Sequence, residues 1–319
     1  MSDSGRPRYL WLDGELMPWE QATVHVSLLG WSTMGGVFEG IKAYWNADHE
    51  QLYGWQFLEH FERLADSMKM QRMSVEHSPQ EWATAALEVL QANNHHEDVY
   101  VRPLAYHADA DWFGTLEDSS TSVLIWTKPF DTVLGTGTVL KAGVSSWTRV
   151  SDNSLSPRIK CISNYQNSRI ALIEANRHGY DQPILLNADG KVTEGPASCL
   201  FIVRDGVAIT PSTTSGILES ITRRTLLRLC EEELDIPVAD REVDRTELYI
   251  ADEVFYCGTG AEVTPVGSVD GYQIGEGGIG PITARIERLF HDLVRGSHER
   301  SAEWCTPVYS AAPATAAAG

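Results

Sequence analysis

Alternating apolar and polar residues near the start of the chain predict β-strands before any helix. The segment RYLWLDGEL alternates in this way and contains Asp13-Gly14, a dipeptide typical of tight hairpins. Apolar residues then recur at helical spacing in FLEHFERLADSMKM, and Ser78-Pro79 predicts the start of a second helix that runs to about Asn93. The alternating segments VYVRPLAY and SVLIWT predict two more strands. We therefore expect residues 1–128 to form a small N-terminal α/β domain.

The remainder of the chain is expected to form a second, larger domain. Residues 129–139 are rich in glycine and threonine, which is typical of an interdomain linker. Residues 140–319 follow as the larger domain, and their low-complexity end, 310–319, is expected to be a disordered tail. The fold class is thus mixed α+β. The elements expected in the larger domain are a strand at 139–147, a helix at 165–178, hairpins at Asp189-Gly190 and Asp205-Gly206, a helix at 219–234, strands at 241–243, 253–257 and 262–266, and a helix after Pro281.

Charge and cysteine content exclude several classes of protein. The formal net charge of −19 would repel nucleic acids and anionic membranes. No apolar run approaches the roughly 18 residues of a membrane-spanning helix, and no signal peptide is evident, so we expect a cytoplasmic protein. Five cysteines without a CxxC pair disfavour a zinc site. The pair His95-His96 lies in the polar segment NNHHED, which indicates a solvated loop, and no metal is expected.

Three glycines near the end of the chain match a dinucleotide-binding pattern by chance. Gly275, Gly277 and Gly280 satisfy GxGxxG, but no long apolar strand precedes them and too little chain follows for a dinucleotide-binding domain. We expect a turn before the last helix.

Lys160 is the first candidate for chemistry. It is one of only six lysines and lies in RIKCISNYQNSR between the apolar residues Ile159 and Ile162. A lysine whose pKa is lowered by burial or by a nearby cation can attack a carbonyl and form a Schiff base. Taken alone, however, the segment favours a lysine that reaches solvent from the end of a strand.

Three other segments supply complementary chemistry. TSGILESITRR predicts a helix start whose free N–H groups can bind a phosphate, although an ordinary N-cap has the same pattern. Glu194 in VTEGPASCLFIV is either an exposed turn residue or a partner for a protonated ring nitrogen. The turn in CGTGAEVTPV can present N–H groups to a carboxylate. With Lys160, these are the groups that pyridoxal 5′-phosphate chemistry on an amino acid requires.

The chain resembles the fold-type IV pyridoxal-phosphate enzymes, and most closely the branched-chain amino acid aminotransferases, from about residue 8 to 296. The resemblance implies a two-domain fold whose larger domain contains a pseudo-barrel, pyridoxal 5′-phosphate as cofactor, and at least a homodimer with active sites near the subunit interface. The segments that carry it are FEGIKAY, LEHFERLADS, YVRPLAY, SNYQNSRIALIEANRHGYD, VTEGPASCLFIV, ITRRTLLRLC, ADEVFYCGTGAEVTPVGSVDG and GEGGIGPIT.

The resemblance also implies which residues bind the cofactor. Lys160 would form the Schiff base and then move the proton between the substrate α-carbon and the cofactor. Glu194 would pair with the ring nitrogen, Tyr165 would hydrogen-bond the phenolic oxygen, and Leu218 would pack against the ring. The phosphate would be held by Arg63, Ser220, Ile221, Thr222 and Thr259.

Substrate recognition is implied in the same way. Tyr100 and Arg102 occupy the family's Tyr-x-Arg strand, which is associated with the substrate α-carboxylate. Thr259, Gly260 and Ala261 would donate N–H groups to that carboxylate. The side-chain pocket would be lined by Phe38, Gly40 and Phe130, the last as a lid on the linker.

Several positions depart from the family pattern. Thr33 replaces a tyrosine, and the loss of this aromatic wall predicts a pocket for side chains bulkier or more polar than leucine. Lys42 replaces an arginine, Gly260 replaces an alanine, and Leu218-Glu219-Ser220 replaces Leu-Pro-Gly. The main prediction is amino transfer between an L-amino acid and a 2-oxo acid such as 2-oxoglutarate. The alternatives are a D-amino acid or (R)-amine transaminase and a 4-amino-4-deoxychorismate lyase on the same fold, which the Tyr100-Val101-Arg102 motif disfavours.

Overall fold

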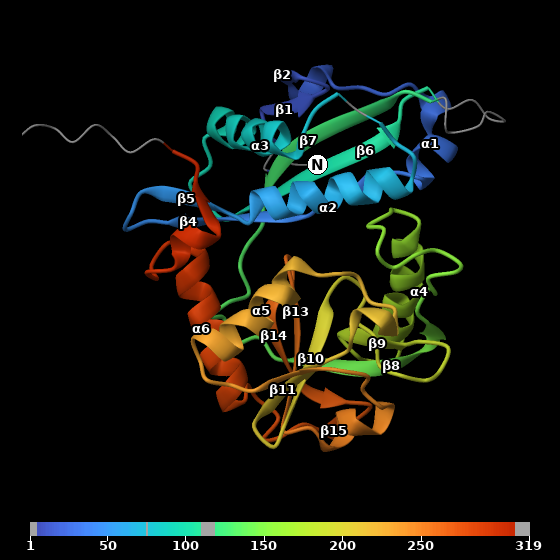
Figure 1. Cartoon of the computed structure of the whole chain (residues 1–319), viewed down its shortest axis with the longest axis vertical. Coiled ribbons are helices and arrows are strands. Elements are labelled where there is room, and N and C mark those ends of the chain that lie inside the picture. Colours follow the sequence, from blue (N-terminus) through green and yellow to red (C-terminus); the bar gives the residue numbers. More distant parts are fainter. Residues whose placement is uncertain (1–4, 75, 110–118, 310–319) are drawn as a thin grey trace, which may run out of the picture.

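The computed structural model describes residues 5–74, 76–109 and 119–309, so the tail expected at 310–319 lies outside the described residues. Two β-sheets of eight strands each dominate it. Figure 1 shows them one above the other, with the blue and green strands of the first sheet above the yellow and orange strands of the second. The predicted mixed α/β architecture is therefore confirmed.

The first sheet is antiparallel and has the order β16-β5-β4-β6-β7-β1-β2, with β3 beside β6. The predicted hairpin forms at Asp13 and Gly14, which both have positive φ as such a turn requires. Helices α2 (Phe57–Met70) and α3 (Pro79–Asn93) pack on this sheet, and a capping box between Ser78 and Glu81 starts α3. The other elements are β1 (Tyr9–Leu12), β2 (Glu15–Pro18), α1 (Trp31–Met34), β3 (Val37–Phe38), β4 (Ile41–Asn46), β5 (Gln51–Trp55), β6 (Val99–His107), β7 (Thr121–Pro129) and β16 (Cys305–Pro307).

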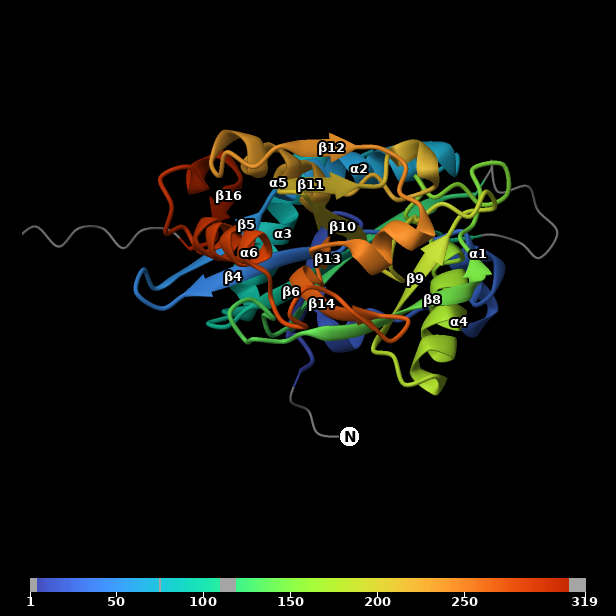
Figure 2. The same ribbon diagram turned by 90° about the horizontal axis from the view of Figure 1, so that it is seen from below.

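The second sheet mixes parallel and antiparallel pairs in the order β12-β11-β10-β13-β14-β8-β9, with β15 beside β14. It is strongly curled, as Figures 1 and 2 show, and buried residues pack on both of its faces. Its elements are β8 (Leu140–Thr148), α4 (Asn164–Arg177), β9 (Gln182–Leu186), β10 (Cys199–Arg204), β11 (Val207–Thr210), α5 (Ile221–Glu232), β12 (Val238–Asp240), β13 (Glu253–Gly258), β14 (Glu262–Val269), β15 (Tyr272–Gln273) and α6 (Pro281–Val294).

Two details of the sequence prediction are wrong. The strand expected at 241–243 forms instead at Val238–Asp240, because Val238 packs on the core while Arg241 turns outward to pair with Glu247. The His95-His96 loop is not fully solvated, because the His95 side chain is 9% exposed and its Nε2 lies 2.9 Å from Thr127 Oγ1.

Two connections bring the sheets together. Residues 130–139 lead from β7 into β8, and β16 returns from the end of the chain to pair with β5 in the first sheet. One core cluster includes Tyr44 and Trp55 of the first sheet together with Phe201 and Phe255 of the second. The glycines of the GxGxxG match form the predicted turn before α6, where Gly275 and Gly277 have positive φ. In the described part of the chain, no helix combines the length and apolarity needed to cross a membrane.

Candidate active site

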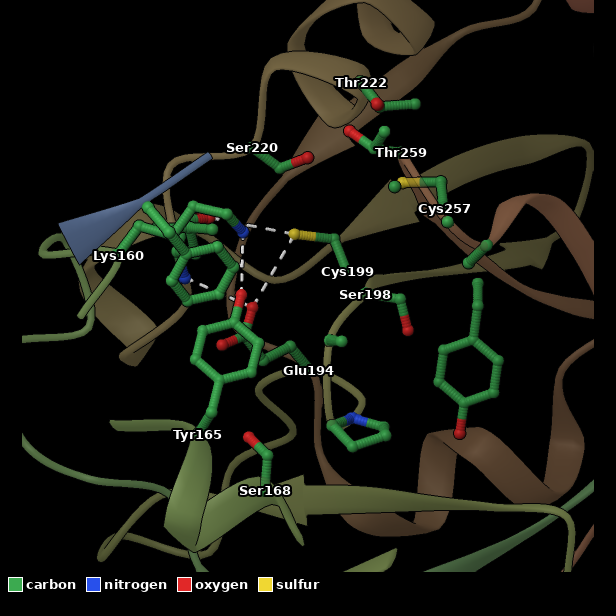
Figure 3. Close-up of a pocket in the computed structure, with 18 of the residues that line it drawn as sticks. Lys160, Tyr165, Ser168, Glu194, Ser198, Cys199, Ser220, Thr222, Cys257 and Thr259 are labelled. Atoms are coloured by element: carbon green, nitrogen blue, oxygen red, sulfur yellow. Dashed lines mark hydrogen bonds between the residues drawn. The ribbon is translucent and has the colours of Figure 1, made fainter. Parts of the chain in front are cut away.

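A cavity of about 1010 Å³ is lined by residues of both sheets and of the segments between their strands. Figure 3 shows a close-up of its walls. Of the predicted site residues, only Gly40 is not among those that line it. The predicted residues that do are Phe38, Arg63, Tyr100, Arg102, Phe130, Lys160, Tyr165, Glu194, Leu218, Ser220, Ile221, Thr222, Thr259, Gly260 and Ala261.

Lys160 is anchored by its backbone to the first sheet and to α2. Its carbonyl accepts a hydrogen bond from the Phe38 N–H at 3.0 Å, and its N–H donates to Ser67 Oγ at 3.2 Å. Its Nζ donates to Tyr165 Oη at 2.7 Å, because the first turn of α4 brings Tyr165 back toward it. The ammonium therefore points into the cavity rather than into solvent.

The expected lowering of the Lys160 pKa is wrong for the chain by itself. Burial lowers this pKa, but the neighbouring Tyr165 hydroxyl and the Glu39 carboxylate raise it by more, so the net shift is upward. Sequence reasoning missed Glu39, which contributes to this upward shift.

Glu194 is held by a residue that sequence reasoning did not identify. Arg149 Nη2 lies 2.7 Å from Glu194 Oε1, and each side chain is 6% exposed. The Leu218 N–H donates to Glu194 Oε2 at 3.2 Å. These contacts fix the Glu194 side chain in the cavity, where it can face the ring nitrogen of a cofactor.

The start of α5 forms an anion-binding wall. Ser220 caps the helix, and its side chain accepts a hydrogen bond from the Arg223 N–H. The N–H groups of Ile221 and Thr222 lie in the first turn, where an α-helix offers them no acceptor. Figure 3 shows Ser220, Thr222 and Thr259 grouped at one side of the cavity, away from Tyr165.

Arg63 is less free than the sequence suggested. Its Nε and Nη2 donate to Glu39 at 2.6 and 2.8 Å, and its Nη1 donates to the Glu219 carbonyl at 2.8 Å. Because a guanidinium has five N–H groups, two donors remain for an anion. Glu39 is completely buried, and although burial raises its pKa, Arg63 and His60 hold that pKa well below the usual range.

His60 extends this buried group to the cavity wall. Its Nδ1 lies 2.8 Å from Glu39 Oε2, and burial lowers its pKa despite the carboxylate, so the ring is neutral at pH 7. With a proton on Nδ1, Nε2 is an acceptor, and it is buried without a hydrogen-bond partner among the described residues. The HxxR spacing of His60 and Arg63 on one helix face is the signal that sequence reasoning overlooked.

Aromatic and cationic side chains form the opposite wall. Tyr100 and Arg102 alternate on β6 and so point the same way, and the Arg102 guanidinium lies 4.1 Å from the centroid of the Phe38 ring. The Phe130 ring packs against Tyr100 with centroids 5.4 Å apart. Gly40 lies behind this wall rather than in it, because a Cβ there would come within 1.8 Å of Tyr100 Oη.

The departures from the family pattern fall in different places. The Thr33 hydroxyl donates to the Gly30 carbonyl at 3.1 Å, and Thr33 is not among the described residues that line the cavity of the single chain. The larger pocket expected from the loss of an aromatic residue at this position stays a prediction. Glu219 accepts a hydrogen bond from Arg158 Nε at 2.9 Å at the surface. Lys42 forms a fully buried ion pair with Glu262.

The cavity fits pyridoxal 5′-phosphate. The N–H donors at the start of α5 and the cationic donors for a phosphate lie on one side, and Glu194 lies beside Lys160 and Tyr165 on the other. Buried polar atoms without a partner among the described residues also face this region, namely Arg149 Nε and Nη1 and His60 Nε2. Such atoms require a polar ligand or water.

Comparison with known proteins identifies the family. The model of the family described as amino-transferase class IV matches residues 36–269. The chain belongs to this family. Class IV aminotransferases use pyridoxal 5′-phosphate, so the predicted fold type, enzyme class and cofactor are confirmed.

The similarity to individual relatives extends over nearly the whole chain. A probable branched-chain-amino-acid aminotransferase of Aquifex aeolicus is 41% identical over 94% of this chain and 97% of its own. The branched-chain amino acid aminotransferase of Thermobaculum terrenum in its pyridoxal-phosphate form has a TM-score of 0.93 and 43% identity, covering 96% of this chain and 99% of its own. The branched-chain aminotransferase of Thermoproteus uzoniensis with norvaline has a TM-score of 0.88 and 40% identity, covering 95% of this chain and 100% of its own.

Proposed function

We propose that this class IV aminotransferase transfers the amino group of an L-amino acid with a branched or bulkier apolar side chain to a 2-oxo acid such as 2-oxoglutarate. The observation that carries the proposal is the contact between Lys160 Nζ and Tyr165 Oη on a cavity that also contains the paired Glu194. The names of its relatives support this substrate class and not the D-amino acid, (R)-amine or lyase alternatives.

The cofactor would be held at four points. Glu194 would bind the ring nitrogen, Tyr165 the phenolic oxygen and Leu218 one face of the ring. Bound pyridoxal phosphate would accept the amino group and draw electrons away from the substrate α-carbon. Lys160 Nζ would carry the proton to and from that carbon. The phosphate would be held by Arg63, Ser220, Ile221, Thr222 and Thr259.

The substrate would be held by its carboxylate and its side chain separately. Tyr100, Arg102 and the N–H groups of the turn 259–261 would bind the carboxylate, because a guanidinium and backbone donors together suit a planar anion. Phe38 and Phe130 would contact the apolar side chain, and Gly40 would make room for the Tyr100 hydroxyl. Because the carboxylate and the side chain bind separately, the same hydrogen-bond donors would hold the carboxylate of the amino acid and that of the 2-oxo acid.

The remaining parts of the proposal concern assembly, location and domains. We infer at least a homodimer in the cytoplasm, with residues 1–128, 129–139 and 140–319 as small domain, linker and large domain. Support for assembly comes from apolar side chains more than half exposed near the first sheet, which a subunit contact would cover. They are Val24, Val26, Leu29 and Met34. Sedimentation of the purified protein tests this: a monomer at micromolar concentration would contradict it.

An absorbance scan of the purified holoenzyme with single amino acids tests the reaction. L-leucine, L-isoleucine, L-valine and larger L-amino acids should convert the cofactor band to that of the pyridoxamine form, and a 2-oxo acid should restore it. Conversion by D-amino acids or (R)-amines alone would replace the proposal by the transaminase alternative. Release of pyruvate from 4-amino-4-deoxychorismate without an amino acceptor would replace it by the lyase.

A further inference from the structure

A buried ion pair joins the two sheets behind the cavity. Lys42 on β4 of the first sheet and Glu262 at the start of β14 of the second are 2.7 Å apart between Nζ and Oε1, and both side chains are 0% exposed. Neither is among the described residues that line the cavity. A charge pair so deeply buried is costly unless its remaining hydrogen-bonding groups are satisfied.

The linker between the sheets satisfies those groups. Thr132 Oγ1 lies 3.0 and 2.9 Å from the two carboxylate oxygens of Glu262, and the Val133 N–H donates to Oε2 at 2.6 Å. Lys42 Nζ also donates to the carbonyl of Asp131 at 3.1 Å. We call Lys42, Glu262 and the linker residues 131–133 the Lys42–Glu262 cluster. It fixes three segments of the chain to one another.

Glu262 directly follows the turn proposed to bind the substrate carboxylate. It pairs with Gly258 across the hairpin, so the turn 259–261 lies between them. Its φ of +49° is in the left-handed region, which is unfavourable for a glutamate and persists only where the surroundings impose it. The contacts of its carboxylate with Lys42 and the linker supply that constraint.

The cluster also contacts the proposed lid residue. Lys42 Nζ lies 5.1 Å from the centroid of the Phe130 ring, within the range of a cation–π contact. Phe130 in turn packs on Tyr100, and a Cβ added at Gly260 would lie 3.8 Å from its Cζ. The cluster thus lies behind both the carboxylate-binding turn and the side-chain wall.

We propose that Lys42 and Glu262 are positioning residues that hold the turn 259–261 and the Phe130-bearing linker in one fixed arrangement, and thereby set the affinity for substrate. The inference rests on the proposed function, because it uses the roles proposed there for the turn and for Phe130. It assigns no contact with substrate to Lys42 or Glu262. Their effect is on KM rather than on the proton transfer at Lys160.

The mildest test removes one hydroxyl from the cluster. In Thr132→Val holoenzyme, Glu262 keeps Lys42 and the Val133 N–H but loses its hydrogen bond with the Thr132 hydroxyl. KM for both the amino acid and the 2-oxo acid should rise about tenfold while kcat stays within about twofold. The cofactor absorbance band should not change. Thr136→Val is the matched control, because Thr136 Oγ1 donates a hydrogen bond to the Val133 carbonyl at the surface of the same linker. KM and kcat of this variant should stay at wild-type values.

Two substitutions at Lys42 test the charge. Lys42→Met leaves Glu262 without its cation, so KM should rise by more than in Thr132→Val, and the freed linker should be cut faster by chymotrypsin after Phe130. Lys42→Arg keeps the positive charge, so its KM and its rate of chymotrypsin cleavage should both lie closer to wild type than those of Lys42→Met. A wild-type KM and cleavage rate in both Thr132→Val and Lys42→Met, or a loss of kcat with KM unchanged, would overturn the inference.

The two proposals fail in different ways. If the wild-type holoenzyme transfers no amino group from any L-amino acid, the proposed function is wrong. Chymotrypsin cleavage after Phe130 needs no turnover, so it still reports whether the cluster holds the linker: faster cutting in Lys42→Met supports the fixed arrangement, and equal cutting contradicts it.

Discussion

Arg149 and Glu194 form a buried ion pair in which Nη2 and Oε1 are 2.7 Å apart. Arg149 lies just after β8, and its Nε and Nη1 have no partner among the described residues although both are buried. The guanidinium therefore fixes the side chain of Glu194. Because Glu194 is the proposed partner of the ring nitrogen, Arg149 would influence the cofactor indirectly, by holding Glu194 in position.

Replacing Arg149 by Gln should destabilise the protein and change the cofactor spectrum. Loss of one partner of a buried pair leaves the other charge uncompensated, which costs about 3 kcal/mol of unfolding free energy. The pH at which the bound cofactor changes absorbance should also shift, because Glu194 loses the cation that holds its carboxylate in place. Thermal unfolding and a spectrophotometric pH titration measure the two effects. Arg177→Gln, an exposed arginine at the end of α4, is the control and should match wild type.

Tyr165→Phe should lower the pKa of Lys160 in the cofactor-free protein. Burial already lowers this pKa, and the substitution removes the neighbouring group that raises it most. More of the amine is then neutral at a given pH, so the midpoint of the pH profile for covalent capture of pyridoxal phosphate should move to lower pH. Stopped-flow absorbance after mixing measures it. A midpoint that stays in place or rises would contradict this prediction, and Lys160→Ala should abolish capture.

Two glycine substitutions should have opposite outcomes. In Gly40→Ala the new Cβ would clash with the Tyr100 hydroxyl, so the melting temperature should fall, with a loss of about 1–3 kcal/mol, and KM should rise. In Gly260→Ala the new Cβ has only an ordinary contact with Phe130, so stability should be unchanged or higher by up to about 1 kcal/mol. Thermal unfolding of both variants decides. Equal destabilisation of the two would show that the Tyr100 clash is not what distinguishes them.

His95 should make the protein less stable in mild acid. Burial lowers its pKa from the ordinary 6.5 to about 4, so between these values the unfolded chain binds a proton that the folded chain does not. Its contribution to stability is therefore full above pH 6.5, declines as the pH falls toward 4, and then levels off. The stability advantage of wild type over His95→Gln should narrow across this window in thermal unfolding. His178→Gln, an exposed histidine after α4, should show no such narrowing.

Local signals predicted much of the fold. The hairpin at Asp13-Gly14 and helix α3 were predictable because turn dipeptides and caps act within a few residues. Lys160 could be singled out from its neighbours, but its assignment depended on the family resemblance, since the residues around it equally suit a solvent-exposed lysine.

Long-range pairs were not predictable, because no local pattern encodes them. Arg149 and Glu194 are distant in sequence, and Lys42 pairs with Glu262 across 220 positions. Each looks like an ordinary surface charge until the sheets are assembled. Glu39 is different: a carboxylate within the apolar run VFEGI is a detectable anomaly, and it indicates a buried partner such as Arg63.

The pairing of β16 with β5 has a consequence for synthesis of the protein. Cys305 aligns with Trp55, so the edge of the N-terminal sheet is completed only by residues made some 250 positions later. While the chain is still emerging from the ribosome, β5 offers unpaired backbone groups to any neighbouring strand. A nascent chain stopped before residue 305 would therefore carry an unpaired strand edge that can associate with another chain.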